Sequence, residues 1–258
     1  MRFEKVYYVM RYMSLKIGIK KKSNNMQKFY CFMFIVSSAY YAYAVEYTQP
    51  YAPYYSQCGQ DKYVNEYIFK GAKQGFFIDV GAHDGISYSN TYYFEQILGW
   101  RGICIEPHQD HFTQLCRNRS AICINAGISN YQGSAQFLKI IGEPEMLSGL
   151  VHTYDPRHVA RIEYELQSRG GSAHIVSVPV YTLQAIVDAY RIARIDLLSI
   201  DTEGGELLIL HSINLHTVDV RVIVVENNYD TTDIHAYLVS MGYQLRARLG
   251  GDCVYTKL

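Results

Sequence analysis

Three acidic side chains, Asp201, Glu203 and Glu206, lie close together at the end of the segment 195–206, which reads Ile-Asp-Leu-Leu-Ser-Ile-Asp-Thr-Glu-Gly-Gly-Glu. An apolar run that ends in acids and two glycines is typical of a buried strand that turns sharply into a helix. Asp201 and Glu203 are candidate catalytic residues, and Asp201 is the candidate proton acceptor, because a positioned carboxylate can take a proton from a reacting hydroxyl. Three such charges repel one another unless a substrate, a cation or shared protons relieve them. Glu206 has a simpler alternative role, which is to complement the positive N-terminal end of the following helix.

A fourth acid follows the next apolar run, where Glu226 precedes Asn227 and Asn228. Neighbouring parallel strands bring their carboxyl ends to the same edge of a sheet, so these groups are expected near Asp201. Carboxylate and amide oxygens are ligands that Mg²⁺ prefers. A magnesium ion between Asp201 and Glu226–Asn227 is therefore one hypothesis, although the sequence fixes no metal ligand set.

A glycine-rich turn follows another apolar run in Asp79-Val-Gly81-Ala-His-Asp-Gly85. Gly81 can take backbone angles closed to other residues, which lets the main chain approach a ligand closely. The spacing lacks the Gly-x-Gly-x-x-Gly of dinucleotide-binding proteins and has an acid just before its first glycine. This pattern favours a methionine-derived nucleoside cofactor, with Asp79, Gly81 and Gly85 as candidate binding residues.

Two further side chains stand at the ends of apolar runs. Glu106 ends the run 102–106, where a carboxylate can accept hydrogen bonds from both hydroxyls of a ribose, as acids do in dinucleotide folds. Asn125 ends the run 121–125 and either bonds an adenine edge or is an ordinary turn residue. Both are candidate cofactor-binding residues.

These side chains need a scaffold in which short buried strands alternate with helices. The predicted strands are 76–80, 102–106, 121–125, 196–200 and 221–226, and the predicted helices are 63–69, 92–98, 109–117, 182–191, 206–213 and 232–241. Such alternation predicts a doubly wound α/β fold with a mostly parallel sheet. The glycine pair 250–251 between two final strand-like runs predicts a closing antiparallel hairpin.

The chain divides into three regions. Residues 1–45 are predicted to be a signal peptide or N-terminal membrane segment, 46–75 a linker with a lead-in helix, and 76–258 the main domain. Residues 130–176 interrupt the alternation and form an insertion, which is either a cap over the substrate or a surface excursion.

The N-terminal region joins basic residues to the uncharged run 29–45, which ends in Ala42-Tyr-Ala44. This small-x-small ending favours cleavage after Ala44, and a permanent anchor or a buried Tyr-rich arm is the alternative. The protein is then exported or associated with a membrane through residues 29–45. If the segment is not used, the domain stays in the cytoplasm.

Charge and cysteine content narrow the function classes. Residues 1–45 hold eight Lys/Arg and one Glu, and the remainder holds 16 Lys/Arg and 23 Asp/Glu. Residues 46–258 contain no basic run, and this disfavours direct nucleic-acid binding. None of the six cysteines has a spacing typical of a zinc site.

Several segments together resemble successive motifs of the FkbM family of S-adenosylmethionine-dependent methyltransferases, over roughly residues 56–245. The segments are 77–85, Ser89-Asn-Thr-Tyr, 99–107, Asn125-Ala-Gly-Ile-Ser and 195–206. The resemblance implies a seven-stranded class I methyltransferase (Rossmann-like) fold and S-adenosylmethionine as cofactor. It also implies methylation of a hydroxyl on a sugar, glycan or secondary metabolite, with a small-molecule or glycan acceptor as partner.

Two other function classes stay open. The Ser89-Asn-Thr motif is shared with Star-like relatives that act in membrane trafficking, so a non-catalytic exported or membrane-trafficking binding module is the alternative. A nicotinamide oxidoreductase is disfavoured by the glycine spacing and the closing hairpin.

Overall fold

The computed structural model describes residues 54–257. The predicted signal or membrane segment, residues 1–45, lies outside this range. Within residues 54–257, no helix has both the length and the apolar character needed to cross a bilayer.

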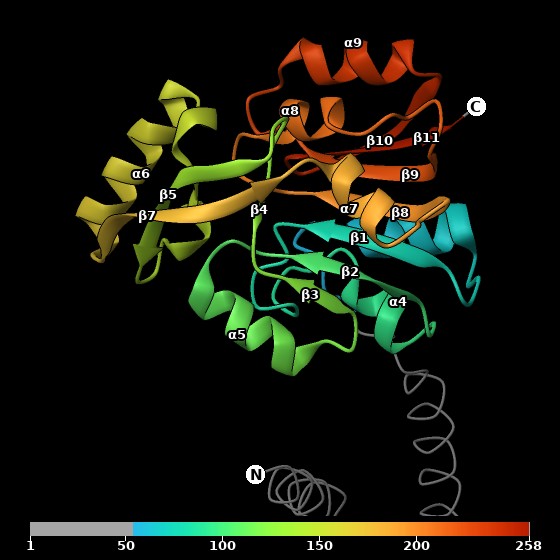
Figure 1. The fold of residues 1–258 in the computed structure, drawn as a ribbon, viewed down its shortest axis with the longest axis horizontal. Helices are drawn as coiled ribbons and strands as arrows, with labels where there is room; N and C mark the ends of the chain where they lie inside the picture. Colours follow the sequence, from blue (N-terminus) through green and yellow to red (C-terminus); the bar gives the residue numbers. More distant parts are fainter. Residues whose placement is uncertain (1–53, 258) are drawn as a thin grey trace, which may run out of the picture. The chain divides into compact units, whose positions relative to one another are not determined.

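A seven-stranded sheet forms the centre of the described domain (Figure 1). Its strands, in spatial order, are β10 (Tyr243–Leu249), β11 (Asp252–Lys257), β9 (Asp219–Glu226), β8 (Arg194–Ile200), β1 (Phe76–Val80), β2 (Arg101–Ile105) and β3 (Ile122–Ile124). Only β11 runs antiparallel to its neighbours, because it returns through a hairpin at Gly250-Gly251. The predicted mostly parallel sheet with a C-terminal antiparallel hairpin is confirmed.

Helices cover both faces of this sheet. They are α3 (Gln60–Tyr63), which continues into the π-helix η1 (Val64–Phe69), and then α4 (Tyr92–Gln96), α5 (Gln109–Asn118), α7 (Leu183–Ala189), α8 (Glu206–His211) and α9 (Thr232–Ser240). In β1, Ile78 and Val80 pack into a core with α7, α8 and α9, whereas Phe77 packs into a second core with η1, α4 and α5. Successive residues of a strand point to opposite faces, so a continuous apolar run such as β1 is what a sheet covered on both sides requires.

The insertion forms a second sheet, beside the first at the left of Figure 1. Its strands are β4 (Gly127–Ile128), β7 (Ser172–Tyr181), β5 (Gly133–Ile141) and β6 (Gly149–Leu150), and its helix is α6 (Pro156–Arg169). Ile162 of α6 packs on Ile140 and Leu147. The long β5–β7 hairpin is not predicted from the sequence, since most of β7 is exposed and lacks the continuous apolar run of a central strand.

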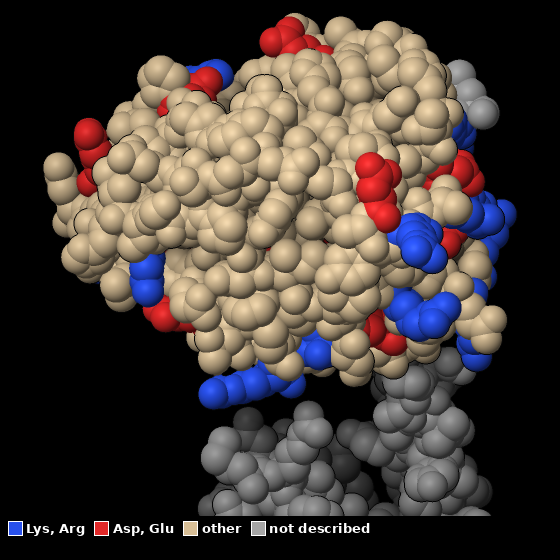
Figure 2. Space-filling view, viewed as in Figure 1, with Lys and Arg blue, Asp and Glu red and all other residues tan. Residues whose placement is uncertain are grey.

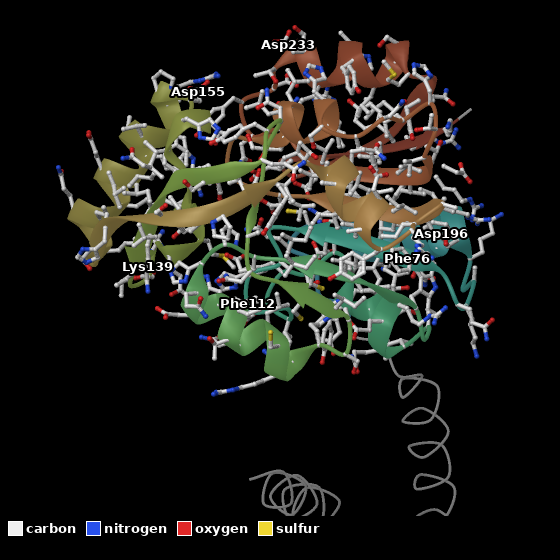
Figure 3. All side chains as sticks on the ribbon, viewed as in Figure 1. Phe76, Phe112, Lys139, Asp155, Asp196 and Asp233 are labelled. Carbon is white, nitrogen blue, oxygen red and sulfur yellow. The ribbon has the colours of Figure 1, made fainter. Side chains whose placement is uncertain are left out.

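A hydrogen bond ties β8 to β1 at the amino end of the sheet. Asp196 accepts a hydrogen bond of 3.0 Å from the backbone N–H of Phe76, and both residues are labelled at the right of Figure 3. The predicted catalytic acids follow β8 at its other end, so this contact lies away from them.

A buried ionic network ties the first two strand–helix units to the end of α5. Arg119 has a fully buried side chain that pairs with Glu95 and donates hydrogen bonds to the Gly85 carbonyl (3.0 Å) and Thr91 Oγ1 (2.9 Å). The Thr91 hydroxyl in turn donates to Asp79 Oδ2 at 2.6 Å. Because removing one partner from a buried ion pair leaves an uncompensated charge, the network depends on Arg119.

We expect Arg119→Met to lower the free energy of unfolding by about 3–5 kcal/mol, because Glu95 and Asp79 lose their only buried counter-charge within the described network. Arg117→Met, on an exposed position of the same helix, should change it by less than about 0.5 kcal/mol. Urea denaturation of the full chain measures both. Equal losses in the two variants would contradict the importance of the network.

Candidate active site

A cavity of about 300 Å³ lies at the carboxyl ends of β1, β2, β8 and β9. In an open α/β sheet this is where ligands bind, at the point where the strand order reverses. The residues that line the cavity include Gly81, Glu106, Asp201, Glu203 and Glu226. The structure therefore brings the predicted ribose acid and the predicted catalytic acids to one cavity.

Gly81 allows the loops after β1 and β8 to meet. Its φ is +87°, and a Cβ at this position would lie 1.8 Å from the backbone oxygen of Asp201. The Asp201 N–H donates to the Val80 carbonyl at 3.0 Å, and the Gly81 N–H donates to the Ile105 carbonyl at 3.0 Å. Only glycine fits here, for reasons of both conformation and space.

Glu106 is a buried carboxylate at the end of β2. Its Oε2 accepts a hydrogen bond from the backbone N–H of His83 (2.9 Å) and its Oε1 accepts one from His108 (2.7 Å). Burial raises its pKa to about 7, although these two N–H groups act in the opposite direction. Each carboxylate oxygen has a further acceptor position, so the group can still bond two ribose hydroxyls.

Asp201, Glu203 and Glu226 form an acidic cluster in which one carboxylate oxygen from each lies within 4.8 Å of the others. Burial, together with the charge of Glu203, raises the pKa of Asp201 well above its ordinary value. Burial, followed by the charge of Asp201, does the same for the pKa of Glu226. Asp201 has accessible surface, and it lines the cavity. The cluster is therefore expected to share protons, or to hold a cation, as the sequence hypothesis of a magnesium ion requires.

Glu206 lies behind this cluster. Its Oε1 accepts hydrogen bonds from the Thr202 N–H (3.1 Å), the Thr202 hydroxyl (2.9 Å) and the Gly204 N–H (3.0 Å). Glu206 thus holds the loop that carries Glu203. This role is close to the simpler one expected for an acid at a helix N-terminus.

The insertion contributes two side chains to the site that are not predicted from the sequence. His158 Nδ1 lies 3.4 Å from Glu203 Oε2, and Arg161 Nη1 lies 3.7 Å from the same oxygen. Burial raises the pKa of Glu203 to about 7, while Arg161 acts to lower it. In the sequence, the three-residue spacing of His158 and Arg161 would place both on one face of a helix. That spacing does not indicate Glu203 as their partner.

Three predicted cofactor-binding residues do not line the cavity. Asp79 and Gly85 belong to the network around Arg119, and a Cβ at Gly85 would lie 2.7 Å from both Arg119 and Leu115 side chains. Asn125 donates to the backbone oxygens of Glu106 (2.8 Å) and Pro107 (3.3 Å). All three support the loops around the cavity, and direct contact with a cofactor stays a prediction for them.

Comparison with known proteins gives one family match. A family model described as "Methyltransferase FkbM domain" matches residues 79–245, well over half of the chain. No curated protein matches significantly.

Similar solved structures include a methyltransferase FkbM from Methylobacillus flagellatus KT, with 15% identity and a TM-score of 0.44. That alignment covers 72% of this chain and 44% of the other, so the chain spans less than half of its length. A TehB-like SAM-dependent methyltransferase from Corynebacterium glutamicum has 11% identity and a TM-score of 0.41, with 86% of this chain and 100% of the other covered. TrmK of M. capricolum, solved with S-adenosyl-homocysteine, has 10% identity, a TM-score of 0.37 and coverages of 76% and 66%.

The family match confirms S-adenosylmethionine as the predicted cofactor. The residues of the cavity fit this group. Glu106 offers acceptor positions to the ribose, and Gly81 belongs to the same cavity lining.

We expect Glu106→Gln to weaken S-adenosylmethionine binding by about 10- to 150-fold, because charge-assisted hydrogen bonds to the ribose are lost while the side-chain volume is kept. Calorimetry on the full chain measures the affinity. Glu163→Gln, on an exposed position of α6, is the matched control and should bind as the unchanged protein does. Unchanged affinity in a folded Glu106→Gln protein would show that the ribose lies elsewhere.

Proposed function

Because the chain belongs to the methyltransferase FkbM domain family, we propose that it transfers a methyl group from S-adenosylmethionine to a hydroxyl oxygen. The proposed acceptor is a sugar, a glycan or a secondary metabolite. One observation carries the proposal: Asp201 and Glu203, at the end of β8, line the same cavity as Glu106, at the end of β2. An acid for the cofactor and acids for a reacting hydroxyl are therefore within one cavity.

The chain's own residues hold and orient the reactants. When bound, S-adenosylmethionine supplies an electrophilic methyl group attached to a positively charged sulfur. Glu106 would accept hydrogen bonds from the ribose, and Gly81 lines the same cavity. Catalysis in such a site comes largely from holding the hydroxyl in line with the methyl group.

Glu203 is the proposed proton acceptor. A general base works best when its pKa is near the working pH, and the pKa of Glu203 is about 7. Asp201, whose pKa lies well above its ordinary value, instead shares a proton with Glu226 and bonds the acceptor hydroxyl. His158 Nδ1, 3.4 Å from Glu203, is placed to receive the proton in turn.

The cavity lining supports a hydroxyl-rich acceptor. Besides the acids, it includes Thr202, Arg161 and Asn228, which can donate hydrogen bonds to hydroxyl oxygens. Figure 2 shows Lys/Arg and Asp/Glu scattered around the edge of the face in view, without a broad basic patch among the described residues of that face. The proposed acceptor is for this reason a small molecule or glycan.

We expect Glu203→Gln to lower kcat by about 100-fold or more, because the variant cannot take the proton of the acceptor hydroxyl. The affinity for S-adenosylmethionine should stay within about twofold, because the ribose contact at Glu106 is intact. Full-chain protein incubated with methyl-labelled S-adenosylmethionine and a panel of sugars and glycans measures the rate, and NMR of the labelled product distinguishes a methyl ether from other products. Glu163→Gln is again the control.

Two outcomes would contradict the proposal. An unchanged kcat in Glu203→Gln would remove this residue as the base. Binding of S-adenosylmethionine without methyl transfer to any acceptor would favour the non-catalytic binding module.

We also propose that residues 1–45 direct export or membrane association, on the basis of the basic residues before the uncharged run 29–45. Cleavage after Ala44 predicts a mature protein that begins at Val45. N-terminal sequencing of exported protein tests this prediction. Intact protein found only in the cytoplasm, with residues 29–45 present, would show that it is wrong.

A further inference from the structure

A second group of ligand-type side chains lines the cavity and has no part in the proposed methyl transfer. It consists of His83, in the loop after β1, His111, in the first turn of α5, and Glu145, in the 3-10 helix Glu145–Leu147 of the insertion. One ligand atom from each lies within 4.8 Å of the others. Three separate parts of the fold therefore converge on one point, with two imidazoles and one carboxylate.

The distances suit an ion between the groups better than direct hydrogen bonds. His83 Nε2 lies 3.7 Å from Glu145 Oε1, and His111 Nε2 lies 3.4 Å from Glu145 Oε2. Hydrogen bonds between nitrogen and oxygen are shorter, at about 2.7–3.2 Å. Ligands about 2.0–2.2 Å from a tetrahedral metal ion lie about 3.4 Å from each other, which agrees with the observed separations.

The surroundings of His83 resemble those of a metal ligand. Both of its ring nitrogens are buried and have no hydrogen-bond partner among the described residues. Its Nδ1 faces Asp84 Oδ1 at 3.6 Å, and Asp84 is itself fixed by the backbone N–H groups of Ile86 (2.8 Å) and Ser87 (2.7 Å). A carboxylate behind a ligating histidine is usual in metal sites, and Asp84 stands in that place, although at 3.6 Å it makes no hydrogen bond to the ring here.

The ring of His111 is also held in place. It stacks on His108, with ring centroids 3.9 Å apart and an angle of 15° between the planes. Its side chain is only 5% exposed, so the ring has little freedom to turn away from Glu145. The site is thus built before any ion arrives.

We propose that His83, His111 and Glu145 bind one divalent transition-metal ion of the Zn²⁺ type. Two imidazoles and a carboxylate suit such ions, whereas the acids around Asp201 offer oxygen alone and suit Mg²⁺. Three protein ligands leave a fourth position for water or a substrate oxygen in the cavity. The ion also fastens the insertion, through Glu145, to the loop after β1 and to α5.

Calorimetry with Zn²⁺ and the full chain, without S-adenosylmethionine, tests this site independently of methyl transfer. We expect one ion per chain, and a loss of affinity of at least about 10-fold in Glu145→Gln and in His111→Gln. His174→Gln, on an exposed position of β7, and Asp201→Asn, in the other cluster, should bind Zn²⁺ as the unchanged protein does.

Absence of Zn²⁺ binding would overturn the proposal. Zn²⁺ binding that Asp201→Asn weakens and Glu145→Gln does not would also overturn it, because the ion would then belong to the acidic cluster. Should His111→Gln fail to fold, as judged by circular dichroism, Glu145→Gln still decides, since its side chain is 42% exposed and its loss should not affect folding.

Discussion

The contact between the backbone of Gly81 and the backbone carbonyl of Asp201 determines the geometry of the site. These residues follow β1 and β8, the two adjacent strands at which the chain turns from one half of the sheet to the other. With any larger residue at position 81 the two loops would separate, and the acids after β8 would move away from Glu106 after β2. Because the contact involves backbone atoms, no change of side chains elsewhere can replace it. The distance between the cofactor acid and the catalytic acids therefore depends on one residue without a side chain.

Much of this arrangement could be predicted from the sequence, because it follows from local patterns. Each central strand is a short apolar run, and a polar residue at the end of such a run must lie at the carboxyl edge of a parallel sheet, as Glu106 and Asp201 do. The contacts that Asp79 and Gly85 make could not be predicted in the same way. Both are fixed by Arg119, more than thirty residues further along the chain, and a partner of that kind is visible only once the helices are packed. The glycine turn was thus correctly linked to a ligand site, while the individual contacts within it depend on tertiary structure.

The insertion, in contrast, could not be predicted in detail from the sequence. Its hairpin buries apolar side chains such as Phe137 and Val180, but most of β7 is exposed, so the strands lack the continuous apolar run by which the central strands are predicted from the sequence. Yet it places His158 and Arg161 against Glu203, and Glu145 against the histidines of the core. This arrangement supports a cap over the substrate rather than a surface excursion. It also explains how so many carboxylates can be tolerated in one cavity, since the insertion supplies cationic or proton-sharing partners to the acids of the sheet.

The central claim is that one cavity holds both the methyl donor and the acids that act on the acceptor. A crystal structure of the full chain with bound S-adenosylhomocysteine tests it most directly. We expect both ribose hydroxyls to bond the carboxylate of Glu106 and the sulfur to face Asp201 and Glu203. A ligand bound outside this cavity, or one whose sulfur points away from these acids, would contradict it.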